Sequence, residues 1–328
     1  MNRIKIAFCD FWDVFDPENN FITDALKKNF DVEISAEPDF VFCSTFGRSH
    51  LKYSCAKIYY TGENLIPDFN LVDYGLGFQD IDFYDRYLRL PHYVLYPEDC
   101  ALALTKHLLS DEEITGHDKF CNYVISNALS DPARDEMIDL LNSYKAVDSG
   151  GRYHNNVGGP VKDKIGFQKK YKFTMAFENT GTRGYTTEKI IQAFASSTIP
   201  IYWGNPDIAD EFNPKAFINC HDFDSFEEVL KEVKRIDNDD AAYRAMVREP
   251  VFTKDSLGRK FLEADYLSDY LHKICSQEPE KAIRRNRVYQ GAYYEEEARF
   301  HEKTDALLKL PRRFIRMMKN RISIVKRK

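Results

Sequence analysis

Short apolar runs that end in polar or glycine-bearing turns recur along the first hundred residues. Such runs are typical of β-strands, and the segment NNFITDALKKNF, which follows the first of them, has helical spacing. The runs are RIKIAFCDF, DFVFCST, KIYYTGEN and DYGLGF. Because the chain becomes polar around LLSDEEITGHDK, the pattern predicts a first α/β domain over residues 1–114.

The second half of the chain alternates strands and helices more regularly, beginning with FCNYVISN. The helix DPARDEMIDLLNSY that follows has Asp131 as its expected cap and Pro132 at its first position. Strands that alternate with such helices form parallel sheets covered on both faces. A chain of 328 residues exceeds the usual size of one core. We therefore predict the α/β class, with two doubly wound, Rossmann-like domains that face a cleft.

The second domain is expected over residues 115–290, followed by a helical C-terminal extension over residues 291–328. Hydrophobic residues make up 43% and charged residues 30% of the chain, as in soluble globular proteins. No apolar run approaches the ~20 residues of a membrane span, and the start, MNRIKIAFCDFW, is better interpreted as a strand than as a signal peptide. Seven scattered cysteines without a C-x-x-C pair favour a reducing, cytoplasmic setting.

The net charge of −6 conceals a basic end. Residues 312–328 hold eight Lys or Arg and no acid, so the remainder is more acidic than the whole, which argues against a nucleic-acid-binding surface. Five apolar residues of this tail fall near one helical face, which suits an amphipathic helix on an anionic membrane surface; a solvated tail is the alternative. They are Phe314, Ile315, Met318, Ile322 and Val325.

Polar side chains stand where predicted strands end, which is where open α/β sheets bind ligands. Glu63 ends KIYYTGEN, and Glu178 and Asn179 end KFTMAFEN. Arg134 and the Glu188–Lys189 pair lie in the first turns of the helices that follow two strands. Each residue alone also fits an ordinary surface or turn position, whereas together they predict a ligand site.

The chemistry of these positions favours a diphosphate. Lys189 is repelled by the helix dipole, at a cost of roughly 0.3–1 kcal/mol, unless an anion occupies the same helix end. Arg134 at a second helix start would complete a clamp, because a guanidinium matches phosphate oxygens. Glu188 would then accept hydrogen bonds from ribose hydroxyls. Glu63, in the other domain, is placed to act as a general base.

Other nucleotide and metal motifs are absent or incomplete. There is no G-x-x-x-x-G-K-[ST] and no H-E-x-x-H, which argues against a P-loop enzyme and a zinc protease. GLGFQD has Asp80 in place of the third glycine of a dinucleotide motif, so an NAD oxidoreductase is not supported. Asp80 and Asp82 form a D-x-D pair, which holds a metal in some glycosyltransferases, but we interpret it as local structure.

The run KFTMAFENTGTRGYTTEKIIQAFASSTIPIYWGNP resembles the signature region of the α-1,3-fucosyltransferases, glycosyltransferase family 10, and most of all their bacterial branch. YYTGENLIPDFNLVDYGLGF resembles the acceptor-side segment of that family, and SNALSDPAR resembles the beginning of its donor domain. The resemblance implies a GT-B fold, a GDP-β-L-fucose donor and inversion at the anomeric carbon. It implies no required cofactor and no metal ligand, and leaves open whether a divalent metal stimulates the reaction.

The resemblance also assigns roles to individual residues. It implies that Glu63 is the catalytic base and that Arg134 and Lys189 bind the diphosphate. The further donor contacts that it implies are Asn179, Tyr185, Glu188 and, near the guanine, Val161. The heptad repeats that precede the basic tail of some bacterial relatives are missing here, so a dimer mediated by repeats is not expected.

We therefore expect an inverting α-1,3-fucosyltransferase that acts on GlcNAc of a Gal–GlcNAc acceptor of the Lewis x type on a bacterial surface glycan. The expected location is the cytoplasmic face of the cytoplasmic membrane, with residues 312–328 at the anionic surface. Two alternatives stay open at this point. One is an α-1,3/4 enzyme that uses type-1 acceptors, and the other is an inactive, membrane-docked protein that binds a nucleotide sugar.

Overall fold

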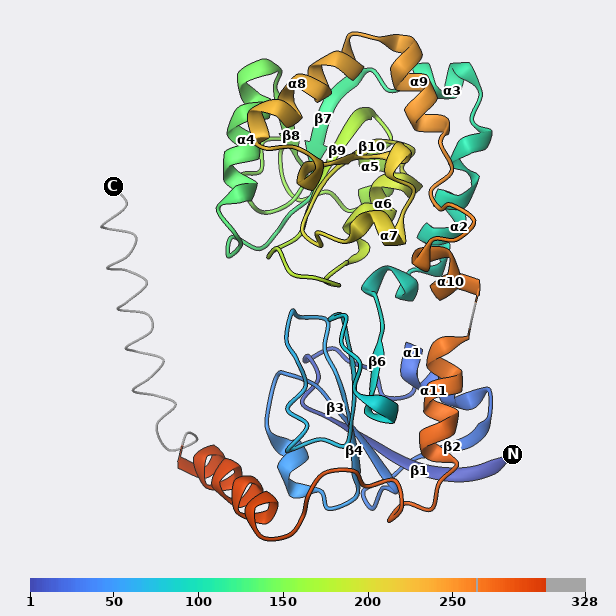
Figure 1. The fold of residues 1–328 in the computed structure, drawn as a ribbon, viewed down its shortest axis with the longest axis vertical. Coiled ribbons are helices and arrows are strands. Elements are labelled where there is room, and N and C mark those ends of the chain that lie inside the picture. Colours follow the sequence, from blue (N-terminus) through green and yellow to red (C-terminus); the bar gives the residue numbers. More distant parts are fainter. Residues whose placement is uncertain (264, 305–328) are drawn as a thin grey trace.

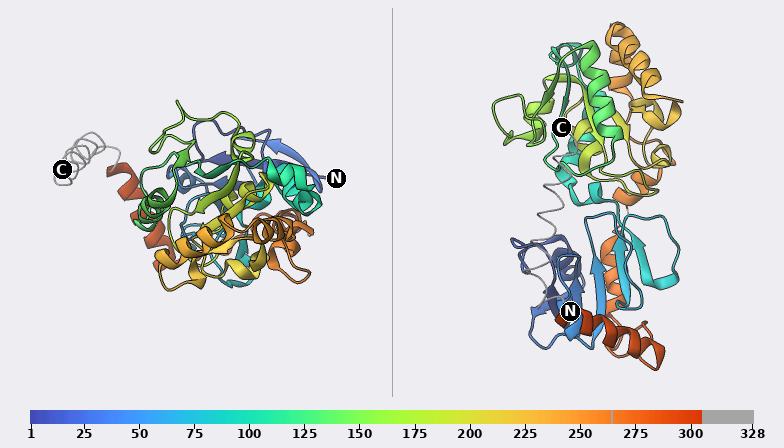
Figure 2. Two further views of the ribbon diagram at one scale, coloured as in Figure 1. Left: turned by 90° about the horizontal axis from the view of Figure 1, so that it is seen from above. Right: turned by 90° about the vertical axis from the view of Figure 1, so that its left-hand side faces the viewer.

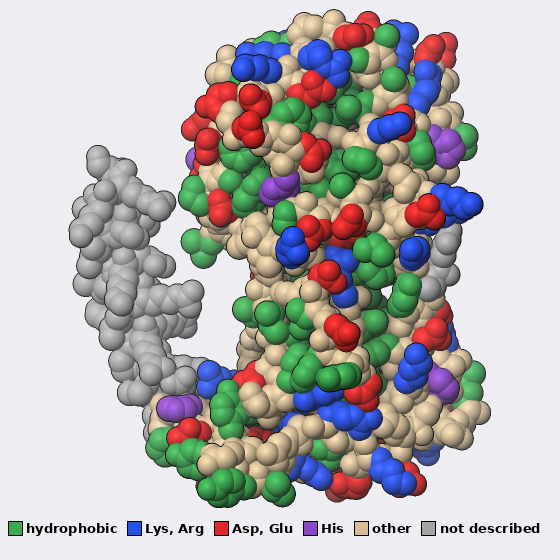
Figure 3. Space-filling view, in the orientation of Figure 1, with side chains coloured by type: hydrophobic (Ala, Val, Ile, Leu, Met, Phe, Trp, Pro, Cys, Tyr) green, Lys and Arg blue, Asp and Glu red, His purple; other side chains and the backbone are tan. Residues whose placement is uncertain are grey.

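The computed structural model describes residues 1–263 and 265–304, which form two α/β domains stacked along the long axis of the molecule (Figure 1, Figure 2). Each domain is built around one sheet whose strands are all parallel. The predicted α/β class with two such sheets is confirmed. Figure 3 shows the narrow waist where the two domains meet.

The first sheet has the strand order β2-β1-β3-β4-β5-β6. Its strands are β1 (Asn2–Cys9), β2 (Phe30–Ile34), β3 (Phe40–Cys43), β4 (Ala56–Tyr60), β5 (Tyr74–Gly77) and β6 (Tyr87–Arg89). The apolar pattern predicts four of them and misses β2 and β6. Both missed strands lie at the edges of the sheet, where side chains are less completely buried and the apolar signal is weaker.

Two helices cover one face of the first sheet, α1 (Phe21–Lys27) and α11 (Tyr266–Cys275). Alternate strand residues such as Phe42 and Ile58 pack against them. Leu271 of α11 is fully buried in this core, so the helix belongs to the first domain and not to the predicted second domain of residues 115–290. The pattern of a single amphipathic helix does not say which of two sheets will bury it.

The second sheet has the strand order β11-β10-β9-β7-β8. Its strands are β7 (Lys119–Tyr123), β8 (Val147–Ser149), β9 (Tyr171–Phe177), β10 (Ile199–Trp203) and β11 (Ile218–Asn219). One face packs on α4 (Ala133–Tyr144), α8 (Phe226–Asp237) and α9 (Asp240–Arg248), and the other packs on α6 (Glu188–Ala195). Shorter helices are α3 (Asp111–Thr115), α5 (Lys164–Gln168), α7 (Ile208–Glu211) and α10 (Leu257–Glu263).

The chain enters the second domain earlier than the boundary predicted at residue 114. Helix α2 (Pro97–Thr105) packs along α6. Its buried residues Cys100 and Ala103 share an apolar cluster with Ile190 and Phe194 of α6. This burial fixes α2 to the second domain, so the crossing lies between β6 and α2.

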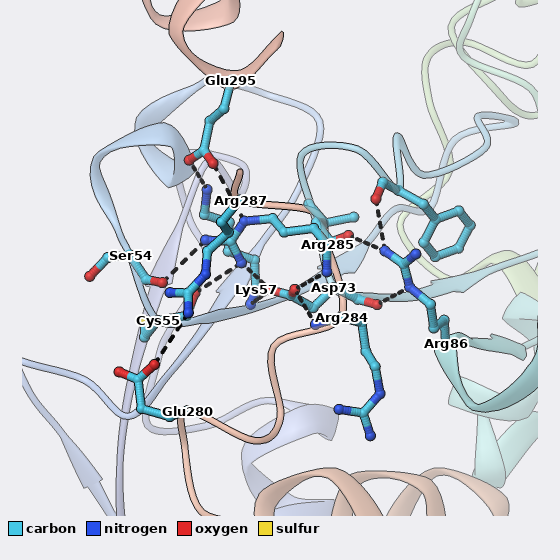
Figure 4. A network of polar contacts seen from close by, with 12 residues as sticks. Ser54, Cys55, Lys57, Asp73, Arg86, Glu280, Arg284, Arg285, Arg287 and Glu295 are labelled. Carbon is cyan, nitrogen blue, oxygen red and sulfur yellow. Dashed lines mark hydrogen bonds and ion pairs between the residues drawn. The ribbon is translucent and has the colours of Figure 1, made fainter. Parts of the chain in front are cut away.

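A network of buried ions fixes the C-terminal segment to the first domain (Figure 4). Asp73, which is fully buried, accepts hydrogen bonds from the backbone N–H groups of Arg284 at 2.8 Å and Arg285 at 2.9 Å, and it pairs with the Arg285 guanidinium. Beside it, Nζ of Lys57 lies 2.8 Å from Oε1 of Glu295. Breaking one member of such a buried network is costly, because the remaining charge loses its partner.

Residues 290–304 are helical and make up the described part of the extension predicted over residues 291–328. The basic tail predicted over residues 312–328 lies outside the described residues. Across residues 1–263 and 265–304, no helix combines the length and the hydropathy that crossing a bilayer requires.

Candidate active site

The strand order of the second sheet places a ligand crevice between β7 and β9. Successive connections leave these two strands toward opposite edges of the sheet, and open α/β sheets bind ligands at the carboxyl ends of such a pair. The loops that follow the two strands touch, since the backbone N–H of Asp131 donates to the carbonyl oxygen of Asn179 at 2.9 Å. Helix α4 begins at Ala133, whose N–H donates to Oδ1 of Asp131 at 3.0 Å, one residue later than the predicted start.

Lys189 lies at this crevice and is held by a buried acid. Its Nζ is 2.7 Å from Oε2 of Glu178, which has no exposed surface. Glu178 also accepts hydrogen bonds from the backbone N–H of Thr187 at 2.7 Å and from its hydroxyl at 2.8 Å. Burial lowers the pKa of Lys189, but the charges of Glu178 and Glu188 outweigh burial and raise that pKa. Lys189 therefore carries a positive charge at neutral pH.

Gly204 makes room for the buried acid. It has a φ of +154° at the end of β10, and a Cβ there would lie 2.4 Å from Cγ of Glu178. Both the backbone conformation and the close approach favour glycine at this position. The W-G-N sequence after β10 thus helps to place Glu178 beside Lys189.

Arg134 is almost completely buried beneath the loop that follows β7, with 1% of its surface exposed. Its guanidinium donates to the backbone oxygens of Asn127 at 2.9 Å and Ala128 at 3.3 Å, and its Cζ lies 4.3 Å from the ring centroid of Tyr153. Its charge acts to lower the pKa of Lys189, so each cation lies within range of the other's field. Among the residues that the structure describes, Nε has no hydrogen-bond partner, and it is 3.6 Å from Oδ1 of Asp135. Two neighbouring cations with spare donor capacity suit an anion with several oxygens.

Glu188 is the first residue of α6 and contacts His92, which lies where the chain passes from the first domain to the second. Its Oε2 is 3.2 Å from Nδ1 of His92. Burial raises the pKa of Glu188, but the His92 hydrogen bond and the charges of Lys189 and Lys164 together hold it far below its ordinary value. Glu188 is therefore an ionised acceptor, suited to hydroxyl groups. Nζ of Lys164 donates to Oε1 of Gln192 at 2.5 Å.

Tyr185 lies in the same neighbourhood with 2% of its surface exposed. Its ring meets Phe78 of the first domain edge-to-face, at 4.9 Å between centroids. Burial raises the pKa of Tyr185, and the charges of Glu178, Glu63 and Glu188 act in the same direction. Tyr185 is thus a neutral hydroxyl surrounded by three carboxylates.

Glu63 reaches the site from the first domain. It is exposed in the loop that follows β4, where its N–H donates to Oγ1 of Thr61 at 3.0 Å. Its neighbour Asn64 donates from Nδ2 to Oγ1 of Thr180 at 2.7 Å and of Thr182 at 2.8 Å. These bonds join the loops that follow β4 and β9, and the charge of Glu63 reaches Tyr185 of the other domain.

The structure thus places Glu63, Arg134, Tyr185 and the Glu188–Lys189 pair around one junction between the domains. The backbone of Asn179 also lies at this junction, where its carbonyl oxygen accepts the N–H of Asp131. Val161 belongs instead to the loop after β8, where its N–H donates to the carbonyl oxygen of Gly150 at 2.9 Å. The sequence-based site does not include His92 and Lys164. His92 is 96 residues before its partner Glu188, and such a distance leaves no local pattern to follow.

No group of three or more His, Cys, Asp or Glu side chains suited to a metal occurs among the residues that the structure describes. Oδ1 of Asp82, from the D-x-D pair, accepts a hydrogen bond from the backbone N–H of Tyr84 at 3.1 Å. Asp82 therefore takes part in the local turn.

Two family models match the chain. Residues 6–96 match the alpha-(1,3)-fucosyltransferase FucT N-terminal domain, and residues 114–249 match the C-terminal part of glycosyltransferase family 10 (fucosyltransferase). The chain belongs to glycosyltransferase family 10. The two matches divide the chain between the domain that carries Glu63 and the domain that carries Lys189.

Relatives match most of the chain. The alpha-(1,3)-fucosyltransferase FucT of Helicobacter pylori is 37% identical over 293 residues, 77% of this chain and 61% of that protein. The putative fucosyltransferase R654 of Acanthamoeba polyphaga mimivirus is 28% identical over 235 residues, 65% of this chain and 38% of that protein. The chain thus spans less than two thirds of the length of these curated relatives.

Solved structures match both domains. A crystal structure of an alpha1,3-fucosyltransferase has a TM-score of 0.75 at 31% identity and covers 88% of this chain and 93% of that one. A crystal structure of alpha1,3-fucosyltransferase with GDP-fucose has a TM-score of 0.72 at 31% identity and covers 87% of this chain and 93% of that one. The fold is therefore GT-B.

Proposed function

We propose that this protein is an inverting α-1,3-fucosyltransferase that moves L-fucose from GDP-β-L-fucose to the 3-hydroxyl of GlcNAc in a Gal–GlcNAc acceptor. The observation that carries the proposal is the pair of cations, Lys189 and Arg134, beyond the carboxyl ends of β9 and β7, where the loop that carries Glu63 joins the loop after β9. Family membership and the likeness to a fucosyltransferase with GDP-fucose support the choice of donor.

Glu63 is the proposed general base. It stands on the first domain, and the acceptor hydroxyl would approach fucose C1 from that side, opposite the departing GDP. As the new bond forms, Glu63 takes the proton from the hydroxyl, and attack from the opposite side inverts the anomeric carbon. Its exposed carboxylate leaves room for an acceptor to bind.

Lys189 and Arg134 are proposed to offset the charge that GDP gains as it leaves. Nζ of Lys189 has three N–H groups, of which Glu178 at 2.7 Å and Thr187 at 3.3 Å accept two, so one remains for a phosphate oxygen. Fixed donors of this kind contribute roughly 3–4 kcal/mol each to transition-state stabilisation. We propose that no metal is required, because these cations supply the charge.

The remaining donor contacts are proposed from position and chemistry. Glu188, an ionised acceptor, would bind ribose hydroxyls, and the neutral Tyr185 hydroxyl would contact the diphosphate or fucose. Asn179 would contribute at the end of β9. The backbone near Val161 would meet the guanine.

We further propose that the acceptor belongs to a bacterial surface glycan that is assembled at the cytoplasmic face of the membrane. The basic residues 312–328 would hold the protein at the anionic surface. A relaxed 3/4 linkage is the alternative within the same class, and the acceptor test below distinguishes the two.

The testing experiment measures fucose transfer to N-acetyllactosamine and to lacto-N-biose with EDTA present, for the wild type and Glu63→Gln. Transfer to the first acceptor by the wild type alone would support the donor, the linkage, the base and metal independence together. Transfer to both acceptors would indicate the 3/4 enzyme. Binding of GDP without transfer to either would point to an inactive nucleotide-sugar-binding protein.

A further inference from the structure

The first domain contains a groove of its own, with a volume of about 590 Å³. It lies between the loops at residues 44–51 and 65–72 and the helix over residues 290–304. This volume is within the range of about 300–1,000 Å³ that small-molecule sites occupy. None of the residues around Lys189 lines it, so the groove is separate from the proposed donor site.

The groove lies beside the switch point of the first sheet, between the segments that follow β3 and β4. The order β2-β1-β3 makes the carboxyl ends of β1 and β3 the switch point of this sheet. The loops that follow these strands are joined through Asp10, which has a φ of +62°. Its carboxylate accepts hydrogen bonds from the backbone N–H groups of Ser49 at 2.8 Å and His50 at 2.9 Å. The loop that follows β1 therefore fixes the segment over residues 44–51, which forms one side of the groove.

The lining combines flat rings with hydrogen-bonding groups. Asp10 orients the His50 ring, since Oδ2 of Asp10 lies 2.7 Å from Nδ1 of His50. The Tyr294 hydroxyl donates to Oδ2 of Asp68 at 2.9 Å. Two acids and one arginine give the lining no cationic cluster for a phosphate. Rings, carboxylates and imidazoles suit an uncharged ligand with many hydroxyls. The lining residues with these groups are Tyr59, Tyr294, His50, His301, Asp68 and Glu297.

The groove continues to the Glu63 loop. Leu65 and Ile66, which follow Glu63 closely in the chain, line the groove and are both exposed. The Tyr59 hydroxyl forms hydrogen bonds with the side chains of Thr45 and Thr61, and Thr61 in turn accepts the N–H of Glu63. One wall of the groove is thus bonded to the loop that carries the proposed base.

The opposite wall is fixed as firmly. Lys57 and Tyr59 are two residues apart on β4 and therefore face the same side of the sheet, away from α1 and α11. Lys57 pairs with Glu295 on the helix over residues 290–304, in the network of Figure 4. This buried pair holds Tyr294 and Glu297, its neighbours on the helix, beside the groove. Because this wall is already ordered, it loses little conformational entropy when a ligand binds.

We propose that this groove binds the part of the acceptor that lies beyond the reacting disaccharide, namely further sugar residues of an oligosaccharide. The inference rests on the proposed function, since it takes the acceptor to be a glycan that reaches Glu63. The protein then binds long acceptors more tightly than short ones, because the distal sugars add affinity while the reacting disaccharide is bound beside Glu63.

The test compares a Gal–GlcNAc disaccharide with an oligosaccharide of three such repeats, at saturating GDP-fucose. For Tyr294→Ala and Glu297→Gln we expect KM for the long acceptor to rise about five- to tenfold, with kcat/KM for the disaccharide and KM for GDP-fucose unchanged. Phe300→Ala is the matched control, because Phe300 is 63% exposed on the same helix and does not line the groove. Glu297→Gln keeps shape and fold, so it serves if Tyr294→Ala is unstable. Equal effects on both acceptors, or none, would overturn the inference.

Saturation-transfer NMR of the oligosaccharide with the full chain, without donor, separates the two proposals. Weaker saturation transfer in Glu297→Gln than in wild type supports the groove even if no fucose is transferred to any acceptor, in which case the proposed function fails alone. If wild type and Glu297→Gln transfer fucose to the long acceptor equally well, the groove proposal fails and the proposed function stands.

Discussion

Nζ of Lys189 lies 2.7 Å from Oε2 of Glu178, a carboxylate with no exposed surface. The lysine that faces the positive end of its helix is thus compensated by an acid that strand β9 places beneath it. Charges buried in this way need each other, since removing one partner leaves the other without compensation. Glu178 is therefore a positioning residue for the proposed clamp.

Lys189→Ala is expected to reduce kcat/KM for GDP-fucose at least a hundredfold, because it removes a fixed cation from the departing diphosphate. The control is Lys231→Ala, which changes an exposed lysine on α8. Steady-state kinetics of the two purified variants would check this prediction. A loss below tenfold in Lys189→Ala would contradict the clamp.

Glu178→Gln is expected to move the alkaline fall of activity to lower pH. The Glu178 charge raises the pKa of Lys189 while burial lowers it, so removal of the carboxylate leaves burial dominant. Lys189 then loses its proton at lower pH, and the phosphate loses its partner sooner. Profiles of kcat/KM from about pH 6 to about pH 10 would show the shift, with Glu98→Gln, an exposed acid on α2, as control. An unshifted profile would mean that Glu178 acts through the fold alone.

Glu63→Gln is expected to lower transfer at least a hundredfold, since an amide cannot accept the acceptor proton. The affinity for GDP should stay within about twofold, because the nucleotide is proposed to bind the other domain. Calorimetry with GDP and a transfer assay on the same preparation would separate the two effects. Equal losses of binding and of transfer would argue that Glu63 shapes the junction and is not the base.

Lys106→Met is expected to stabilise the protein near neutral pH. Burial lowers the pKa of Lys106 to about 7, and its Nζ donates to the Val247 oxygen at 2.6 Å. Between this value and its ordinary pKa the unfolded chain binds more protons, so the stability of the wild type rises with pH in that window. At pH 7 the buried lysine lowers the free energy of unfolding by on the order of 4 kcal/mol. The substitution leaves the Val247 oxygen without its partner, which costs about 1–3 kcal/mol and offsets part of the gain.

Thermal unfolding of Lys106→Met and wild type at several pH values would check that prediction. The difference in melting temperature should be largest below pH 7 and should shrink as the pH rises from 7 toward the ordinary pKa of lysine. A constant difference at all pH values would show that packing, and not charge, sets the effect.

The sequence was informative where physics is local. The apolar runs locate the central strands, and the position of Lys189 at a helix start indicates an anion site before any contact is known. Arg134 shows the limit: it lies in the first turn of α4 as predicted, but its guanidinium also binds backbone oxygens of its own loop, which no spacing predicts. The groove is built from residues 44–72 and 294–301, and only tertiary packing through Asp73 and Lys57 brings these ranges together.

Within residues 1–263 and 265–304 the chain passes between the domains twice, once between β6 and α2 and again between α10 and α11. The two connections define an axis, and rotation of one domain about this axis stretches neither connection. Twisting one domain against the other, or drawing them straight apart, would strain both connections. Such a rotation of the domains must break the Asn64 bonds to Thr180 and Thr182, which join them at the site.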